Sequence, residues 1–239
     1  MKVHRYADRP DLLALRWEKL AQSAFPEYMN NNVPGNKYWG RLYDDFPGFQ
    51  LALVDGDELV AELHSVPTAW DGSEADRPAG WDEAFLRAFE SGRPADVLCA
   101  LAIAVRRDRQ GEGLAARMLE EMRGAAGRGN LRELIAPVRP TLKSRYPLIP
   151  IEEYMRWRRA DGAHFDPWLR VHERVGGEIV AASPSSMTIE APVAEWEEWI
   201  RLPLPADGDY VVPEMLAPLS VRDGVGRHVE PNVWLRHRL

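Results

Sequence analysis

Apolar residues along the chain fall into short runs that alternate with helical stripes. The runs Phe49 to Val54 and Leu59 to Pro67 flank Asp55-Gly56-Asp57, and an Asp-Gly turn between two apolar runs predicts a β-hairpin. Two further runs, Val97 to Val105 and Leu131 to Val138, lie on either side of an amphipathic stretch. Strands that alternate with helical patterns in this way indicate a mixed α/β fold.

The amphipathic stretch begins directly after Gly111 and Gly113. Its apolar stripe predicts a helix that ends near Gly127 to Gly129. The first-turn N–H groups of a helix have no partner within it, and glycine leaves room for an anion to approach them. The turn is therefore typical of a phosphate-binding site. The basic residues between Arg106 and Gln110 are expected to add mobile positive charge.

Smaller elements are expected before this turn. Met1 to Arg9 predicts an edge strand, and Asp11 is a plausible cap for the helical pattern that follows it. A short helix is expected at Lys37 to Asp45, in a segment rich in aromatic residues. The polar segment Asp71 to Pro94 has the pattern of an insertion that carries an amphipathic helix from Trp81 to Phe89.

A second insertion is expected after the fourth apolar run. It spans residues 139–165, and its prolines precede a helical piece at Ile151 to Ala160. Asp166-Pro167 predicts the start of a last helix. Two strands are expected beyond it, at Glu178 to Ala182 and at Ser186 to Ile189.

The last fifth of the chain is expected to be an extension. The main domain would cover residues 1–191, and the extension residues 192–239. It has a helical pattern at Val193 to Ile200 and two apolar runs, Tyr210 to Val212 and Val233 to Leu235. These runs predict strands that join the edge of the sheet or pack on a partner subunit, which would make a homodimer.

Composition narrows the class of protein. At 239 residues, with 45% hydrophobic composition, the chain can bury a substantial core. Its net charge of -7 argues against nucleic acid as the main partner. Because no apolar run approaches about 18 residues, we expect no membrane span or secretory signal, and a cytoplasmic protein. The single Cys99 and the scattered histidines predict no disulfide and no metal site.

The glycine turn separates three families of anion-binding site. A P-loop needs Lys and Ser or Thr after its second glycine, and this chain has Leu114 and Ala115 there. A dinucleotide fingerprint needs a third glycine, which is missing. The pattern that fits is (Arg/Gln)-x-x-Gly-x-(Gly/Ala), present from Gln110 to Ala115 after a strand that ends at Val105. In this position the pattern resembles motif A of the GNAT superfamily of N-acetyltransferases.

The resemblance implies a GNAT fold and an acyl-CoA cofactor, either acetyl-CoA or another acyl-CoA. The fold would have a mixed central sheet of about seven strands flanked by helices. In this family the fourth and fifth strands splay apart, and the pantetheine arm pairs with the main chain of the fourth, here Ile103, Ala104 and Val105. The pyrophosphate would lie on the turn, at Arg109, Gln110, Gly111, Glu112, Gly113, Leu114 and Ala115.

Candidate catalytic residues lie elsewhere. Glu62 and His64 share one face of a strand, and either could take a proton from an amine; if that face meets solvent, they are surface residues. The family's Tyr-x-x-x-Gly-Phe, aligned on Gly176, places His172 where many members have a Tyr that protonates the CoA thiolate. That histidine is a candidate acid or a helix residue satisfied by a neighbour. Thr141 lies in the second insertion.

That insertion has two interpretations. As a lid beside the cofactor cleft it would supply contacts to the substrate; otherwise it is an ordered loop that covers the core. The candidate contacts are Thr141, Lys143, Arg145, Tyr146 and Tyr154.

Three functions remain open from the sequence. The first is an acetyl-CoA-dependent N-acetyltransferase in which the amine of a small molecule attacks the thioester directly. The second is an acyl transferase or decarboxylase of the malonyl-CoA type that acts with a carrier protein, using His172 and Thr141. The third is a non-catalytic acyl-CoA-binding module. The acceptor stays open because variable loops build its groove.

Overall fold

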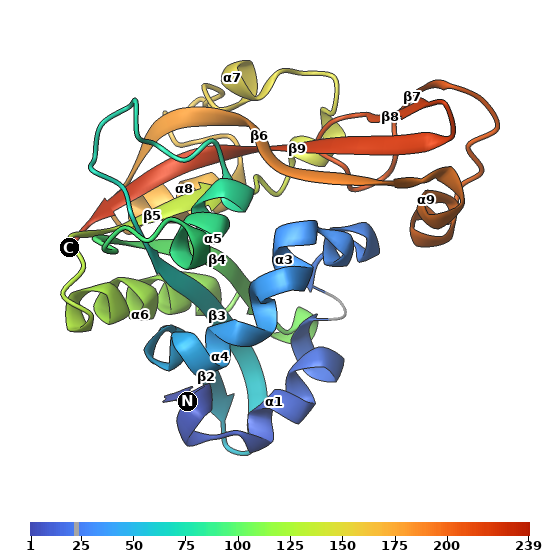
Figure 1. The fold of residues 1–239 in the computed structure, drawn as a ribbon. Coiled ribbons are helices and arrows are strands. Elements are labelled where there is room, and N and C mark those ends of the chain that lie inside the picture. The colour runs from blue at the N-terminus through green and yellow to red at the C-terminus, as the bar shows by residue number, and fades with distance from the viewer. Residues whose placement is uncertain (22–23) are drawn as a thin grey trace.

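The structure is a computed structural model that describes residues 1–21 and 24–239. Its strands form one mixed sheet in the order β1-β2-β3-β4-β5-β9-β8-β7, and β6 pairs with the other edge of β9 (Figure 1). The pair β4 and β5 is parallel, and the other pairs are antiparallel. The strands are β1 (Lys2–Arg5), β2 (Gln50–Asp55), β3 (Glu58–Thr68), β4 (Val97–Val105), β5 (Glu133–Val138), β6 (Gly177–Pro192), β7 (Gly208–Tyr210), β8 (Leu219–Arg222) and β9 (Val225–Arg238).

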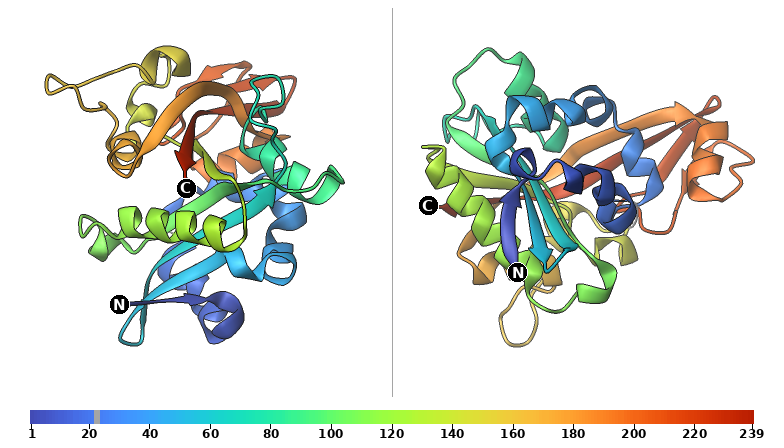
Figure 2. Two further views of the ribbon diagram at one scale, coloured as in Figure 1. Left: turned by 90° about the vertical axis from the view of Figure 1, so that its left-hand side faces the viewer. Right: turned by 90° about the horizontal axis from the view of Figure 1, so that it is seen from below.

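Helices cover both faces of the sheet (Figures 1 and 2). They are α1 (Asp11–Arg16), α3 (Val33–Tyr38), α4 (Leu42–Asp45), α5 (Trp81–Glu90), α6 (Leu114–Arg128), α7 (Ile151–Tyr154), α8 (Pro167–Arg174) and α9 (Val193–Ile200). Successive residues of β4 point to opposite sides: Leu98 packs in the cluster under α6, and Cys99 packs in the cluster that includes residues of α5. We call the side with α3, α4 and α5 the α5 face.

Most local predictions are confirmed. β2 and β3 form the expected hairpin, in which Gly56 has φ +61°, a conformation that favours glycine. The helices expected at Trp81 to Phe89 and after Gly113 are α5 and α6. The edge strand is shorter than expected because the chain turns at Tyr6 into a 3-10 helix that buries this tyrosine.

The helix expected at Ile151 to Ala160 is wrong beyond its first turn. Only Ile151–Tyr154 is helical. The chain then doubles back: Arg158 forms a β-bridge with His164, and the Phe165 N–H donates to the Trp157 carbonyl. These cross-chain hydrogen bonds replace the helical ones, so the amphipathic pattern there reflects packing of a hairpin-like loop.

β4 and β5 diverge as expected. They pair at Leu98–Leu134 and Cys99–Ile135, and no further pair joins them in the described part of the chain. Beyond that point β4 continues to Val105, while β5 pairs only with β9. The two strands therefore leave a splay whose apex is the pair Cys99–Ile135.

The expected position of the C-terminal strand is wrong. Val233 to Leu235 belongs to β9, which lies inside the sheet with β5 on one edge and β6 on the other. Val233, Trp234 and Leu235 are all buried, and a strand buried on both faces needs neighbours on both edges. The two strands expected at Glu178 to Ile189 are one strand, β6, with an irregularity after Ser183. The sheet thus continues past residue 191, where the sequence placed a domain boundary.

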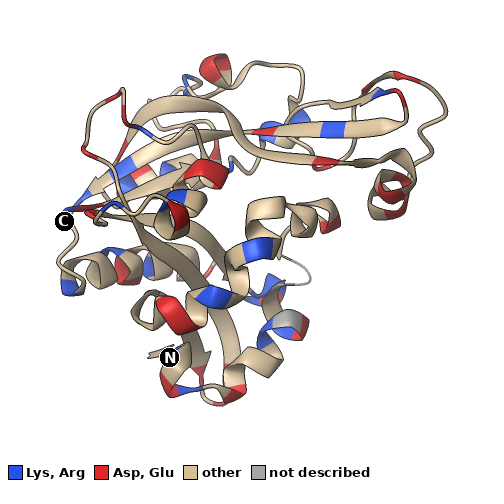
Figure 3. Cartoon of the chain, in the orientation of Figure 1, with Lys and Arg blue, Asp and Glu red and all other residues tan. Residues whose placement is uncertain are grey.

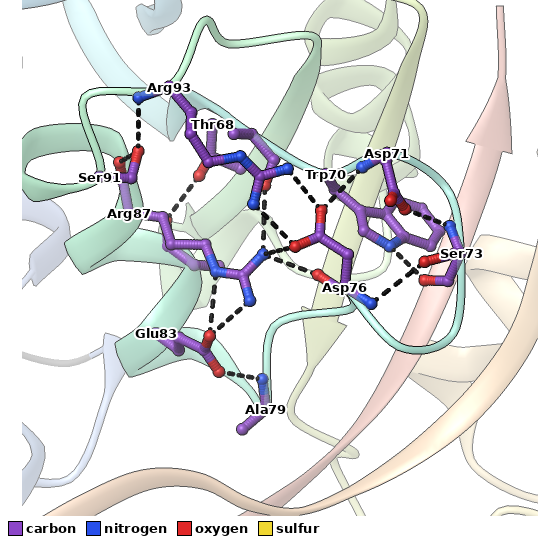
Figure 4. Close-up of polar contacts among 12 residues, drawn as sticks. Thr68, Trp70, Asp71, Ser73, Asp76, Ala79, Glu83, Arg87, Ser91 and Arg93 are labelled. Carbon is purple, nitrogen blue, oxygen red and sulfur yellow. Dashed lines mark hydrogen bonds and ion pairs between the residues drawn. The ribbon is translucent and has the colours of Figure 1, made fainter.

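The insertion at residues 71–94 is tied together by charged side chains (Figure 4). The Asp76 carboxylate accepts hydrogen bonds from Arg93 and Arg87, and the bond from Arg93 is the main reason that its pKa is lowered. Trp81 anchors the insertion to the sheet: its N–H donates to Ser186 Oγ (2.9 Å), and its indole Nε1 donates to the Leu101 carbonyl (3.0 Å). The insertion therefore covers the α5 face above β4.

Candidate active site

The glycine turn stands open at the end of β4. Gly111 (φ +87°) and Gly113 (φ +79°) are both left-handed, and a Cβ on either would meet no atom within 4 Å. Glycine is thus required there by the backbone conformation. Gly113 is the N-cap of α6, and no described side chain caps this helix. The N–H groups of its first turn are therefore available to an anion.

Two arginines beside the turn are already paired, which corrects the expectation of mobile charge for these two. Arg109 Nε lies 2.8 Å from Glu112 Oε1, and its Nη2 lies 3.1 Å from Asp55 Oδ2. Arg106 pairs in the same way with Asp108 (2.6 Å) and contacts one further carboxylate. The positive potential at the turn therefore comes from main-chain N–H groups and from Arg107, which is exposed and forms no ion pair with a described side chain.

The end of β4 borders the splay. On one edge, Ile103, Ala104 and Val105 pair with β3. The other edge of this segment faces β5, but it lies past the last pair between β4 and β5, where the two strands have separated. The side chains of Ile103 and Val105 pack in the cluster under α6, whereas Ala104 packs on the opposite side. This edge could pair with an extended amide chain.

Glu62 and His64 are buried on β3, so they are not surface residues. Glu62 accepts hydrogen bonds from Tyr6 Oη (2.6 Å) and from Arg16 Nη2 and Nε (2.9 and 3.0 Å). Burial alone would raise the pKa of Glu62, but the nearby His64 and Arg16 lower it to about 2. Glu62 is therefore an ionised carboxylate whose lone pairs are largely engaged.

The tautomer of His64 follows from its partner Gln50. The Gln50 amide nitrogen donates to the carbonyls of Phe46 and Ser65, so its Oε1 is an acceptor. His64 Nδ1, 3.1 Å from that oxygen, carries the proton. Its Nε2 is left facing Arg16 Nη2 (3.4 Å) and Glu62 Oε2 (3.3 Å).

The His64 ring lies close to β4 and to the α5 face. His64 is opposite Ala102 on β4. The Trp39 ring contacts both the His64 ring (5.0 Å between centroids) and the Trp81 ring (6.5 Å). An imidazole nitrogen thus sits beside the strand that borders the splay.

His172 lies at the level of the apex. Its Nδ1 is 2.9 Å from His237 Nε2, and His237 is opposite Leu134, which pairs with Leu98. Burial, followed by the effect of His237, lowers the pKa of His172 to about 3. At neutral pH His172 is uncharged, and its buried Nε2 has no hydrogen-bond partner among the described residues.

Thr141 and His172 lie on different elements and differ in exposure. Thr141 is exposed in the loop after β5, and the neighbouring Leu142 N–H donates to Asp166 at the N-cap of α8. His172 is buried on α8, and its Nδ1 is engaged by His237. No hydrogen bond joins Thr141 to His172 in the described part of the chain.

Two of the other candidate lid residues anchor the second insertion. Lys143 is buried, and its Nζ donates to the carbonyls of Tyr146 (2.8 Å) and Leu216 (2.6 Å). Tyr154 is buried too, and its hydroxyl donates to Asp166 (2.8 Å). Both side chains are engaged in holding the insertion to the fold.

Sequence reasoning missed a buried ion pair on the α5 face. The Arg139 guanidinium donates to Glu230, to Tyr28 Oη and to the Glu214 carbonyl. Burial would raise the pKa of Glu230, but Arg139 and then His228 lower it below the ordinary value. In the sequence, Arg139 and Glu230 are each a charged residue close to an apolar run. Such positions are too common to identify an ion pair.

Two features of the structure also bear on the class of protein: the grouping of metal-binding side chains and the length of its apolar helices. Within the described ranges, no three His, Cys, Asp or Glu side chains gather closely enough to hold a metal ion. No helix of the described chain is long and apolar enough to cross a membrane.

Comparison with known proteins establishes the family. No family model matches the chain. The arginine N-acetyltransferase avaD of Aspergillus versicolor is 30% identical over 97% of this chain and 91% of the relative. The chain therefore belongs to the GNAT superfamily of N-acetyltransferases, as the glycine turn predicted.

Solved structures agree with this fold. The loading GNAT-like domain of CurA from Lyngbya majuscula has a TM-score of 0.61 and 19% identity, over 99% of this chain and 96% of that chain. The GNAT-like decarboxylase GphF in complex with isobutyryl-CoA has a TM-score of 0.60 and 16% identity, over 100% and 99% of the two chains. At these identities the likeness concerns the fold.

Proposed function

We propose that this chain is an acetyl-CoA-dependent N-acetyltransferase whose acceptor is arginine or an arginine-like small amine. The observation that supports acetyl-CoA as the acyl donor is the splay of β4 and β5, with an uncapped glycine turn at its open end. The acceptor rests on the similarity to an arginine N-acetyltransferase over nearly the whole chain. The same similarity favours this function over transfer with a carrier protein.

The cofactor site consists of main-chain groups. The residues from Arg109 to Ala115 would hold the pyrophosphate with N–H groups of the turn and of the first turn of α6. The free edge of Ile103, Ala104 and Val105 would pair with the pantetheine amides. Acetyl-CoA supplies the acyl group as a thioester. A main-chain N–H of β4 would stabilise the oxyanion that forms when an amine attacks it.

His64 is the better candidate for the base. Glu62 is ionised at neutral pH, but its oxygens already accept three hydrogen bonds from Tyr6 and Arg16. In the neutral form of His64, Nε2 carries the lone pair and contacts only the Arg16 and Glu62 side chains, at longer distances. We infer that His64 removes the amine proton through water, and that Glu62 fixes Arg16 beside it and stabilises the imidazolium.

His172 would stabilise the departing thiolate by a hydrogen bond, because burial keeps its imidazole uncharged and it has no second proton to give up at neutral pH. The thiolate then takes its proton from water. A neutral imidazole can donate from Nε2 when its Nδ1 accepts a hydrogen bond, and His237 Nε2 lies in place to give that bond. His237 is then a positioning residue. Thr141, exposed on the loop after β5, is at most an acceptor contact. A cytoplasmic location and a homodimer remain predictions from the sequence.

Release of free thiol from acetyl-CoA tests the function. We expect the purified chain to release CoA with L-arginine and to form an N-acetyl product detectable by mass spectrometry. His64→Asn should lower kcat about a hundredfold or more, because general-base catalysis contributes about that much.

Two results would contradict the proposal. One is no product with any amine although acetyl-CoA binds, which would indicate a binding module. The other is thiol release from malonyl-CoA with a carrier protein and none with amines. His4→Gln, on a half-exposed histidine of β1, is the matched control and should keep full activity.

A further inference from the structure

A hollow opens on the α5 face beside the Arg139–Glu230 pair. It lies between the 3-10 helix η3 (Glu27–Asn31), the end of α9 and the segment 212–214. Two aromatic rings, two carboxylates and four apolar residues line it: Tyr28, Trp199, Glu27, Glu214, Pro26, Ile200, Val212 and Pro213. These segments are far apart in sequence, so only the tertiary structure creates the hollow. We call it the η3–α9 pocket.

The rim of the η3–α9 pocket is acidic. Glu27 and Glu214 are exposed residues from two different segments that line it. Glu27 lies 3.9 Å from Arg201, at the limit of an ion pair between exposed side chains. No Lys or Arg nitrogen among the described residues lies within 4.0 Å of the Glu214 carboxylate. Figure 3 shows further acidic positions on α9, and so the surroundings do not neutralise the rim.

The wall of the pocket already binds one guanidinium. Arg139 donates to the Glu230 carboxylate, to Tyr28 Oη (3.3 Å) and to the Glu214 carbonyl. The negative charge of Glu230 is therefore balanced by Arg139 within the wall of the pocket. The carboxylates of Glu27 and Glu214 keep the opening negative, and the ring of Trp199, which is only partly buried, is available to a cation. Tyr28 is buried and supports the wall.

The wall of the pocket is linked to the end of β5. Arg139 directly follows β5, which ends at Val138, and its guanidinium donates to Tyr28 Oη and to the Glu214 carbonyl in that wall. β5 is also one of the two strands that form the splay.

We propose that the η3–α9 pocket binds the guanidinium group of the acceptor while the acceptor's reacting nitrogen lies at the splay. This inference rests on the proposed function and names the group by which the acceptor is selected. A guanidinium is planar, weakly hydrated and stacks on aromatic rings, so an acidic opening with the partly buried Trp199 suits it better than a compact ammonium.

A larger hollow elsewhere does not fit this role. It is lined by residues of β1, of the segment before β2 and of the C-terminal end of α6, such as Arg5, Phe49 and Arg128. The glycine turn is at the opposite, N-terminal end of α6. Along α6 the residues that line that hollow begin at Glu121 and end at Arg128, roughly 12 to 22 Å from the turn.

L-citrulline provides the sharpest test because it has the shape of arginine without the charge. We expect the wild-type chain to prefer L-arginine over L-citrulline by about tenfold or more in kcat/KM. Glu27→Gln/Glu214→Gln should raise KM for L-arginine about tenfold and leave KM for L-citrulline and for acetyl-CoA unchanged. Trp199→Leu should act in the same direction.

Glu198→Gln is the matched control, because Glu198 is exposed on α9 next to Trp199 but does not line the pocket. It should keep the wild-type preference. Equal use of citrulline and arginine by the wild type, or an unchanged preference in the double variant, would overturn the inference while the proposed function stands.

Calorimetry without acetyl-CoA separates the two proposals. L-arginine should bind the wild type, and the double variant should bind it about tenfold more weakly. If no amine is acetylated but this difference is found, the proposed function fails and the pocket assignment holds. If arginine binds both proteins equally, the pocket assignment fails.

Discussion

At the scale of single residues, the His172–His237 pair couples the site to stability. Burial and the neighbouring imidazole lower the pKa of His172 from 6.5 to about 3. Burial also lowers the pKa of His237, to about 4. Below pH 6.5 the unfolded chain therefore binds more protons than the folded chain. Stability should rise with pH across this range and be lost as the pH falls.

The double variant His172→Leu/His237→Leu tests this coupling. From about pH 6.5 to about pH 4.5, the wild type should lose about 2 kcal/mol of unfolding free energy per pH unit more than the variant, about 1 kcal/mol for each of the two imidazoles that the variant lacks. Urea unfolding followed by circular dichroism at several pH values measures the slope.

His4→Gln removes a half-exposed histidine and should keep the wild-type slope. Equal slopes in the wild type and the double variant would mean that the pair titrates normally. The single variant His172→Ala probes the chemical role: we expect lower turnover with nearly unchanged acetyl-CoA affinity. A large loss of affinity at normal turnover would contradict the proposed hydrogen bond from His172 to the thiolate.

At the scale of elements, the glycine turn and α6 show how a conformation becomes a binding site. Gly113 is left-handed and is the N-cap, whereas Gly127 lies inside the same helix with open space around it. The same substitution should therefore have opposite effects at the two positions.

We expect Gly113→Ala to lower the free energy of unfolding by roughly 1 kcal/mol, because an L-residue is strained at positive φ. It should also weaken acetyl-CoA binding, since relief of the strain moves the N–H groups of the turn. Gly127→Ala should raise stability by roughly 0.5–1 kcal/mol and leave binding unchanged.

Thermal unfolding and calorimetric titration with acetyl-CoA measure both effects. If Gly113→Ala binds acetyl-CoA as tightly as Gly127→Ala does, the turn does not hold the cofactor.

At the scale of the whole molecule, β9 joins the two halves of the sheet. Every residue of β5 pairs with one edge of β9, and β6 pairs with the other edge of β9. Trp234 lies in the large cluster of the α5 face, while Val233 and Leu235 lie in the cluster with Leu169 of α8. The end of the chain is thus part of the core of both layers.

Truncation should show this dependence. A chain of residues 1–191 lacks β9 and leaves β5 and β6 with unpaired edges and exposed apolar faces, so we expect no cooperative thermal transition. Removal of Leu239 alone, which is exposed, should leave the melting temperature unchanged. A cooperative transition in the 1–191 chain would show that the tail is dispensable for folding.

The local predictions succeeded where neighbouring residues decide the structure. The Asp55-Gly56 turn sets its hairpin through one positive φ, and the stripe that starts at Leu114 sets α6 through side-chain spacing. The piece after Tyr154 failed because contacts between Arg158 and His164 compete with helical hydrogen bonds. That competition is invisible to periodicity.

The sequence by itself determined the mixed α/β class, the hairpin, the glycine turn with its helix, and from these the family. Tertiary structure alone decided that β9 enters the middle of the sheet and that Arg16 meets Glu62 and Arg139 meets Glu230. The physical reason is the distance in sequence between the residues that interact. Turns and helices depend on residues a few positions apart, whereas these ion pairs join residues 46 and 91 positions apart, which only the packing of distant strands brings together.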